Sequence, residues 1–247
     1  EASAAMNSAF KLYDVFPVSD TDFNTDKGTL NKVNVSYRPS GKNQNYYFTS
    51  SEGYRRGGVN AVPTEGPLAE DAGWVPFESD TVKNIEFGVK GALADGTYYN
   101  LSYFMVDWDN PQLNTSTPVN GYYAVVNGDT AQINGFDVEL SGSAGAIDWN
   151  VGYSNKNARL SSDFYTPADT PVLYARSGAK LPGSPDHTFN LNLAHTSYFG
   201  KTDDILSGMG MVNRLDLYAQ SSTRNYIGDN SAYDAEFDGF NIINASS

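Results

Sequence analysis

Residues 84–108 read NIEFGVKGALADGTYYNLSYFMVDW, two alternating segments joined at Asp95-Gly96. Ile85, Phe87, Val89 and Leu93 share one parity, and the charged Glu86 and Lys90 share the other. Successive side chains of a β-strand point to opposite faces, so the stretch predicts a hairpin with one apolar and one charged face. A soluble sheet would place the apolar face on a core. A membrane barrel would place it in lipid and the charged face in a wet lumen.

The composition limits the possible partners. The 247 residues include 16 basic and 29 acidic side chains, and the net charge of −13 argues against nucleic acid and against docking on an anionic leaflet. The chain has no cysteine, and therefore no disulfide or thiolate metal site. No apolar run approaches the roughly 18 residues of a transmembrane helix. Barrel strands are compatible with that, because every second residue of such a strand is polar.

Alternating segments recur along the chain, and no long segment shows helical periodicity. We expect about nine strands, near residues 33–37, 46–48, 85–93, 98–108, 136–140, 147–153, 189–193, 214–217 and from 240 onward. Short connections at 39–44, 94–97, 143–146 and 200–205 alternate with long polar ones at 52–83, 109–130, 157–186 and 221–238.

The alternation of short and long connections distinguishes a membrane barrel from a soluble sheet better than the periodicity of the strands does. In an antiparallel meander, alternate connections lie at opposite ends of the sheet. Short periplasmic turns and long extracellular loops are typical of outer-membrane barrels, and aromatic residues near the strand ends favour the same reading. The sequence thus predicts an all-β, antiparallel transmembrane barrel. Long structureless loops are usually functional or disordered, so these four suggest a shared binding mouth.

Three segments resemble the TonB-dependent outer-membrane receptors. Ser51-Glu-Gly-Tyr-Arg-Arg-Gly-Gly-Val-Asn60 is similar to the family's Ser-x-Gly-Phe/Tyr-Arg-x-Gly-Gly-Phe-Asn, with Val59 in place of Phe. Asn84-Ile-Glu-Phe-Gly-Val-Lys90 is similar to Asn-Tyr-Glu-Leu-Gly-x-Lys, with Ile85 in place of Tyr. Residues 127–140 are close to Asn-Ala-Gly-x-Ala-x-x-x-Gly-x-Glu-x-Glu, and 181–193 also fit.

The resemblance implies a barrel of about 22 strands in the outer membrane of a Gram-negative bacterium. It implies import of a ferric siderophore or similar iron complex, with cobalamin or a glycan as alternatives, powered by the TonB–ExbB–ExbD complex. We expect residues 1–247 to form a portion of one barrel domain of about nine strands, without the N-terminal plug, in contact with outer-membrane lipid. We expect no enzymatic activity and no cofactor. A soluble or secreted β-rich ligand-binding module is the alternative.

Ligand contacts are expected in the long loops. Arginine recognises carboxylate and phosphate bidentately, although pairing with nearby carboxylates is the plainer role. Exposed aromatic rings can stack on sugar or catecholate rings, although loop packing or the outer aromatic belt is the alternative. The candidate ligand contacts are Glu52, Tyr54, Arg55, Arg56, Trp74, Tyr122, Tyr123, Tyr165 and Tyr226.

Side chains of Ile85 parity are expected to face lipid: Ile85, Phe87, Val89, Leu101, Ile147, Trp149 and Val151. We expect no metal site, because the oxygen-rich residues 107–110 lack the glycine and distal glutamate of a calcium loop. His187 and His195 share a parity but lie too far apart along a strand for one metal ion. No catalytic motif occurs, and an enzymatic barrel would need a carboxylate–histidine pair at the loop end.

Overall fold

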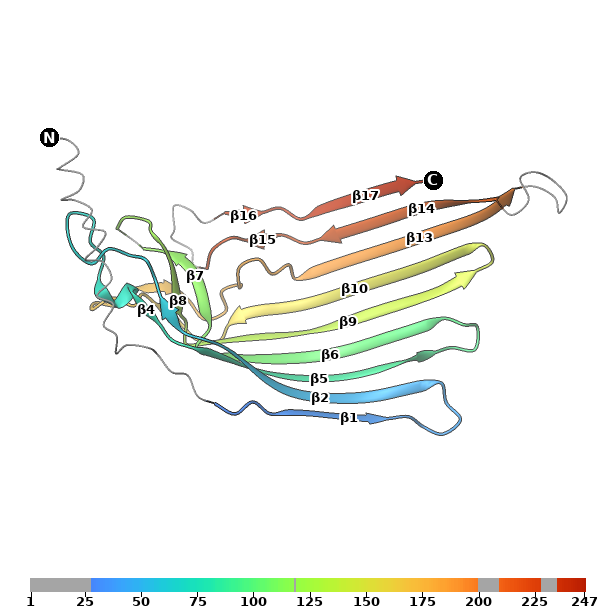
Figure 1. The fold of residues 1–247 in the computed structure, drawn as a ribbon, viewed down its shortest axis with the longest axis horizontal. Helices are drawn as coiled ribbons and strands as arrows, with labels where there is room; N and C mark the ends of the chain where they lie inside the picture. The colour runs from blue at the N-terminus through green and yellow to red at the C-terminus, as the bar shows by residue number, and fades with distance from the viewer. Residues whose placement is uncertain (1–27, 118, 200–208, 228–234) are drawn as a thin grey trace.

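The computed structural model describes residues 28–117, 119–199, 209–227 and 235–247. Its main feature is one antiparallel sheet of nine strands in the order β1-β2-β5-β6-β9-β10-β13-β14-β17, with β1 and β17 at the edges (Figure 1). The strands are β1 (Lys32–Tyr37), β2 (Gln44–Arg55), β5 (Asp80–Ala92), β6 (Tyr98–Asp109), β9 (Thr130–Ala144), β10 (Ile147–Leu160), β13 (His187–Phe199), β14 (Met209–Gln220) and β17 (Phe240–Ser246). The predicted sheet of about nine strands is confirmed.

Short turns lie at one end of the sheet and long connections at the other, as expected (Figure 1). The turn at 94–97 closes with a hydrogen bond of 2.8 Å from the Leu93 N–H to the Thr97 carbonyl. Gly96 has φ +89°, a left-handed conformation that glycine adopts without steric cost. The short connection expected at 200–205 lies outside the described residues.

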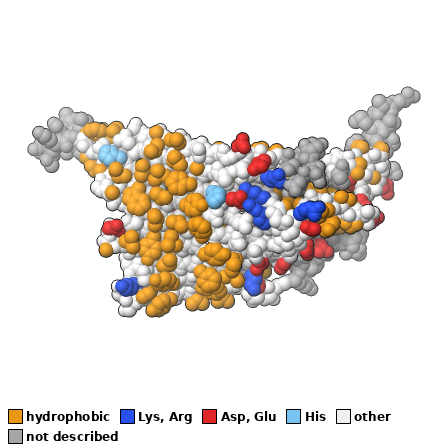
Figure 2. All heavy atoms as spheres, turned by 180° about the vertical axis from the view of Figure 1, so that it is seen from behind, with side chains coloured by type: hydrophobic (Ala, Val, Ile, Leu, Met, Phe, Trp, Pro, Cys, Tyr) orange, Lys and Arg blue, Asp and Glu red, His pale blue; other side chains and the backbone are white. Residues whose placement is uncertain are grey.

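The register separates the two faces of the sheet. Tyr46, Val89, Leu101, Val138 and Tyr153 lie opposite one another across five strands and share one face, which we call the apolar face. All the predicted lipid-facing residues lie on it: Ile85, Phe87, Val89, Leu101, Ile147, Trp149 and Val151. Figure 2 shows the apolar side chains as a broad band over the strands. In the described part of the chain no second sheet packs on this band, unlike in the soluble alternative.

The long connections contain secondary structure, so the expectation of structureless loops is wrong. Each holds a short hairpin: β3 (Gly58–Val59) with β4 (Pro76–Phe77), β7 (Gln112–Ser116) with β8 (Tyr123–Asn127), β11 (Phe164–Tyr165) with β12 (Leu173–Ala175), and β15 (Thr223–Arg224) with β16 (Glu236–Phe237). A 3₁₀ turn, Ala72–Trp74, precedes β4. No helix in the described residues is long and apolar enough to cross a membrane.

Candidate functional site

The buried core of the chain lies at the loop end of the sheet. We name the connections at 56–79, 110–129, 161–186 and 221–239 the first to fourth long loops. All four, together with the loop ends of β9 and β10, contribute to a single apolar cluster: Val62, Trp74, Leu113, Ala124, Val126, Ala131, Ala158, Leu160, Phe164, Ala175, Leu181 and Ile227. The cluster members on β9 and β10 are Ala131, Ala158 and Leu160, and they lie on the same face of the sheet as Glu86. We call this face the polar face. The loops therefore pack over the polar face at this end of the sheet.

Asp80 anchors the first two loops to the sheet. Its carboxylate is 1% exposed and accepts hydrogen bonds from the Trp108 indole N–H at 2.9 Å and the Gln112 backbone N–H at 3.1 Å. It also forms an ion pair with Arg55, whose guanidinium lies 5.1 Å from the centre of the Trp108 ring. Arg55 is therefore held in one orientation, and about half of its side chain (53%) stays exposed on the polar side of the sheet.

Two polar side chains join the first loop to the second. The Asn60 side chain donates to the Val125 carbonyl at 2.6 Å and accepts from the Val125 N–H at 2.8 Å. Glu70, which is 7% exposed, accepts from the Thr117 hydroxyl at 2.7 Å and the Asn120 N–H at 2.9 Å. Buried polar groups need such partners, so these bonds fix how the two loops fit together.

The first loop also reaches the third. Asp71 accepts from the backbone N–H groups of Gly73 at 2.8 Å and Asp169 at 3.1 Å, and these two bonds lower the pKa of Asp71. At Gly73 a Cβ atom would lie 1.7 Å from the Pro167 carbonyl oxygen. Only glycine permits this approach of the two backbones.

Asp186 holds the third loop against β10. Its carboxylate pairs with Arg159 and Lys180, each at 3.1 Å, and Lys180 also donates to the Ser222 carbonyl of the fourth loop at 2.9 Å. Burial raises the pKa of Asp186, but the hydrogen bonds from Arg159 and Lys180 outweigh burial and lower it. The four loops thus form one connected assembly.

The structure divides the candidate contacts of β2. Arg55 lies on the polar face beneath the loops, whereas Glu52 and Tyr54 lie on the side of the apolar face. Glu52 accepts two hydrogen bonds of 2.9 Å from Asn31, one from its backbone and one from its side chain. The Arg56 side chain is exposed.

The aromatic candidates also divide. Trp74 is 1% exposed and belongs to the loop core, so the expectation of an exposed ring there is wrong and loop packing describes it. Tyr122 packs against the same core. Tyr123 and Tyr165 are 63% and 50% exposed, and Tyr226 is partly buried beside Ile227.

Sequence reasoning missed the residues that organise the loops: Asn60, Glu70, Asp71, Asp80 and Asp186. Asn60 ends the first motif and Asp80 lies within the segment that leads into the second, so proximity to the motifs was the available signal. Asp186 lies within the segment 181–193, which also resembles the family. Glu70 and Asp71 lie in no recognised motif, and they bond to residues of the second and third loops.

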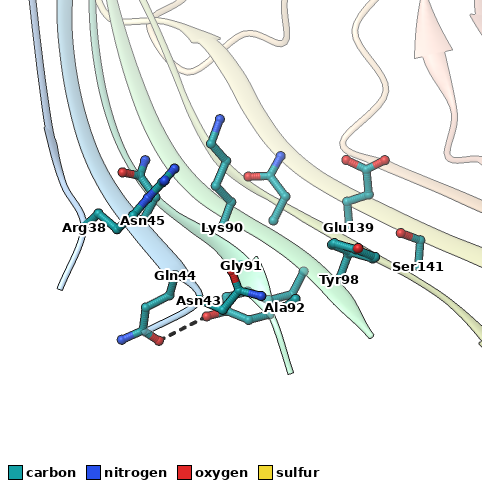
Figure 3. Close-up of a pocket in the computed structure, with 12 residues that line it drawn as sticks. Arg38, Asn43, Gln44, Asn45, Lys90, Gly91, Ala92, Tyr98, Glu139 and Ser141 are labelled. Carbon is teal, nitrogen blue, oxygen red and sulfur yellow. Dashed lines mark hydrogen bonds between the residues drawn. The ribbon is translucent and has the colours of Figure 1, made fainter. Parts of the chain in front are cut away.

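The polar face carries a row of hydrogen-bonding groups near the turn end. Asn45, Lys90, Asn100 and Glu139 lie opposite one another in register and line a hollow of about 440 Å³. Figure 3 shows Lys90 and Glu139 rising on one side of the sheet, whereas Gln44 points to the other. Such a wall suits a polar, water-filled interior.

The described part of the chain holds no cluster of three or more His, Asp or Glu residues placed for a metal ion. The ring nitrogen Nδ1 of His187 contacts the Tyr153 hydroxyl at 2.9 Å and the Asn155 amide at 3.3 Å, neither of which is a carboxylate. In the oxygen-rich segment 107–110, the Asn110 amide donates to the Ser79 carbonyl at 3.0 Å.

Comparison with known proteins gives a family and a set of folds. The family model for the TonB-dependent receptor-like β-barrel matches residues 9–247. No curated relative matches the sequence. Among solved structures, the ferric yersiniabactin uptake receptor FyuA from Yersinia pestis is 16% identical, with a TM-score of 0.62, over 87% of this chain and 29% of its own.

Two further structures share the fold. The siderophore receptor PiuA from Acinetobacter baumannii is 12% identical, with a TM-score of 0.58, over 87% of this chain and 28% of its own. The copper transporter OprC is 10% identical, with a TM-score of 0.55, over 86% of this chain and 30% of its own. This chain therefore spans less than a third of each of these three structures, and at these identities the likeness concerns the fold alone.

Proposed function

The chain belongs to the TonB-dependent receptor β-barrel family, and from that premise we propose that it forms part of a receptor that imports a scarce nutrient. Proteins of this family are outer-membrane proteins of Gram-negative bacteria, and so is this chain. One observation carries the proposal: a sheet with an open apolar face and a polar face that four interlocked loops cover at one end. A lipid-embedded wall with a lumen and a covered mouth needs this arrangement.

We propose a ferric siderophore or similar iron complex as cargo, with cobalamin or a glycan as alternatives, and the TonB–ExbB–ExbD complex as the energy source. Two of the solved structures of similar fold are siderophore receptors, which supports an iron complex as the cargo. A third structure of similar fold is a copper transporter. Arg55 is the strongest candidate contact, since it is held by Asp80 and half exposed on the polar side. Tyr123 and Tyr165 offer exposed rings. We propose no catalytic activity.

Deletion of the receptor gene tests this function. Cells without the gene should lose energy-dependent uptake of radioactive iron from conditioned medium under iron limitation, and the intact gene should restore uptake. Arg55→Ala should weaken cargo binding while the barrel still assembles, because the Asp80 carboxylate keeps two other donors. Unchanged uptake in the deletion strain, across iron, cobalamin and glycan supplies, would refute the proposal.

Orientation is tested by labelling single cysteines on intact cells. Val119, which is 75% exposed in the second loop, is the external site. Ala94 lies in the opposite turn and is exposed. We expect a membrane-impermeant maleimide to label Val119→Cys and to spare Ala94→Cys. The reverse pattern would invert the topology and exclude a mouth at the loop end.

A further inference from the structure

An exposed aromatic ring, Tyr98, lies on the polar face near the turn end of the sheet. Its side chain is 63% exposed, and it stands opposite the small residues Ala92 on β5 and Ser141 on β9. Lys90 and Glu139 lie one step further along these two strands, on the same face. Figure 3 shows the Tyr98 ring low on the wall, with Lys90 and Glu139 extending beyond it. The ring therefore forms part of the floor of the hollow of about 440 Å³.

The polar side chains beside this ring have no partner within the part of the protein that the structure describes. There, the side chains of Asn45, Lys90, Asn100 and Glu139 make no direct hydrogen bond or ion pair. Glu86, which shares their face, accepts from the Tyr47 hydroxyl at 2.7 Å and not from Lys90. The four groups are therefore free to bond to an occupant of the hollow.

Comparable groups on the other half of the polar face bond to one another. The Asn190 side chain on β13 donates to Asn150 on β10 at 3.1 Å. The Asn192 side chain donates to Asp216 on β14 at 2.9 Å. All four of these side chains lie on the polar face. The sheet thus satisfies its inward amides internally on β10–β14 and leaves them open in the hollow.

The free groups of the hollow match a hydroxylated ring. The Asn45 and Asn100 amides both donate and accept, Lys90 only donates and Glu139 only accepts. Sugar hydroxyls do both, so one sugar can satisfy all of these groups. Because Glu139 lies on one side of Tyr98 and the cations Lys90 and Arg38 lie on the other, the hollow has charges of both signs and disfavours a simple anion or cation.

Two further properties fit a sugar. An exposed aromatic ring can stack on the apolar face of a sugar ring. The volume of the hollow lies within the range of about 300–1,000 Å³ that is usual for small-molecule sites. Stacking and hydrogen bonding would then act on the same molecule, from the floor and from the sides.

We propose that the hollow binds a sugar, which stacks on Tyr98 while its hydroxyl groups bond to Lys90, Asn100 and Glu139. The proposal rests on the wet interior of the proposed function and deepens its cargo. A glycan, or a complex that carries a sugar, would make its last contact with this wall here before it leaves at the turn end. Uptake by cells and sugar binding by the purified receptor are separate measurements, so either can fail alone.

The test uses the full receptor, purified in lauryldimethylamine oxide, a detergent without a sugar headgroup. Saturation-transfer NMR titrations measure the dissociation constants of maltose, cellobiose and chitobiose. For the disaccharide that binds most tightly, Tyr98→Ala should weaken binding about five- to ten-fold, because it removes the stacked ring. Tyr98→Phe keeps the ring and should change the affinity less than two-fold. Tyr103→Ala is the matched control, since Tyr103 lies on the apolar face of the same strand, and it should leave binding unchanged.

A second pair of variants tests the hydrogen bonds. Asn100→Leu keeps the size of the side chain and should weaken binding about five-fold, because it removes a donor and an acceptor. Asn190→Leu is its control, since this amide lies on the same face but bonds to Asn150 outside the hollow. No binding of any of the three disaccharides, unchanged binding in Tyr98→Ala, or equal losses in a variant and its control would overturn the proposal.

Discussion

Trp74 and Phe87 are both large apolar side chains, yet Trp74 is 1% exposed and Phe87 is 51% exposed. Trp74 lies in the loop assembly and belongs to the apolar cluster to which all four long loops contribute. Phe87 lies in the middle of β5, beside Phe48 of the neighbouring strand, whose ring centre is 4.9 Å away. The same kind of side chain is therefore buried in one region of the chain and exposed in the other.

The difference follows from the solvent of each region. Loops that stand in water must bury their apolar side chains against protein, so they build a core like that of a small soluble domain. Strands that stand in lipid need no such cover, because the bilayer is as apolar as the side chains. Substitutions in the loops should therefore lower stability when they remove packing. Substitutions on the apolar face of the strands should lower stability when they add polarity.

The largest effect is expected in the loop core. Trp74→Ala should lower the free energy of opening the loop assembly by about 3–5 kcal/mol, because it leaves a cavity where a buried ring was. Hydrogen exchange of loop amides measures this free energy, and the strands should keep their protection. Tyr123→Ala, at a side chain 63% exposed, is the control and should change it by about 0.5 kcal/mol or less. Equal effects would mean that the loops have no core.

On the apolar face the sensitive change is a charge. Val89→Arg should destabilise the barrel by about 2–4 kcal/mol, because it places a cation within the band that faces lipid. The neighbouring Lys90→Glu should leave the barrel folded, since Lys90 lies on the polar face. Urea titration of the receptor refolded into vesicles measures both. If Lys90→Glu proved the more costly change, the assignment of the two faces would be reversed.

The sheet could be read from the sequence because alternation repeats along it. Segments such as Phe136–Asp137–Val138 show which side chains share a face, and the lengths of the connections show which strand ends are joined tightly. The short hairpins within the loops could not be read in the same way. β3 and β4 have two residues each, too few for a period to be visible. The residues next to them are held by the loop assembly: Asn60 bonds to Val125, and Val75 packs against the apolar cluster.

The site was predicted only in part, for a similar reason. Arg55 stood out in a recognisable motif, but its partner Asp80 lies 25 residues away, and their pairing depends on the register of β2 against β5. A shift of one residue would turn one of them to the other face. The burial of Trp74 could not be predicted either, because the cluster that contains Trp74 draws its residues from segments far apart in the sequence.

A smaller effect is expected where the loop assembly meets the sheet. Asp80→Asn keeps the shape of the side chain but turns an amide toward groups that donate, including the Trp108 indole and the Gln112 N–H. This should cost about 1–3 kcal/mol in loop opening, read from exchange of the Gln112 amide. Glu78→Gln is the control, because Glu78 is exposed and its carboxylate accepts one long bond of 3.3 Å. An unchanged exchange rate in Asp80→Asn would mean that Asp80 does not anchor the loops.

The smallest expected effect is that of pH on opening of the loops. It should be seen at the loop end of the sheet and not depend on the turn end. The hydrogen bonds of Asp71, and those that outweigh burial at Asp186, hold both pKa values below the ordinary value of about 3.9. A carboxyl whose pKa is lowered on folding stabilises the folded form fully above its unfolded pKa, and this contribution is lost as the pH falls through the folded pKa. The loops should therefore stay closed from pH 8 to about 5 and open more readily below about pH 4.

Asp71→Asn combined with Asp186→Asn should flatten that pH dependence, as measured by pepsin cleavage of the loops between pH 5 and 3. Asp95 provides the control from the opposite end: its pKa is also lowered, mainly by the Thr97 N–H, but it lies in a short turn. Asp95→Asn should leave loop cleavage unchanged at every pH. If it shifted loop cleavage as much as the double variant, the acid response would belong to the whole barrel, and the loops would not behave as a separate water-exposed unit.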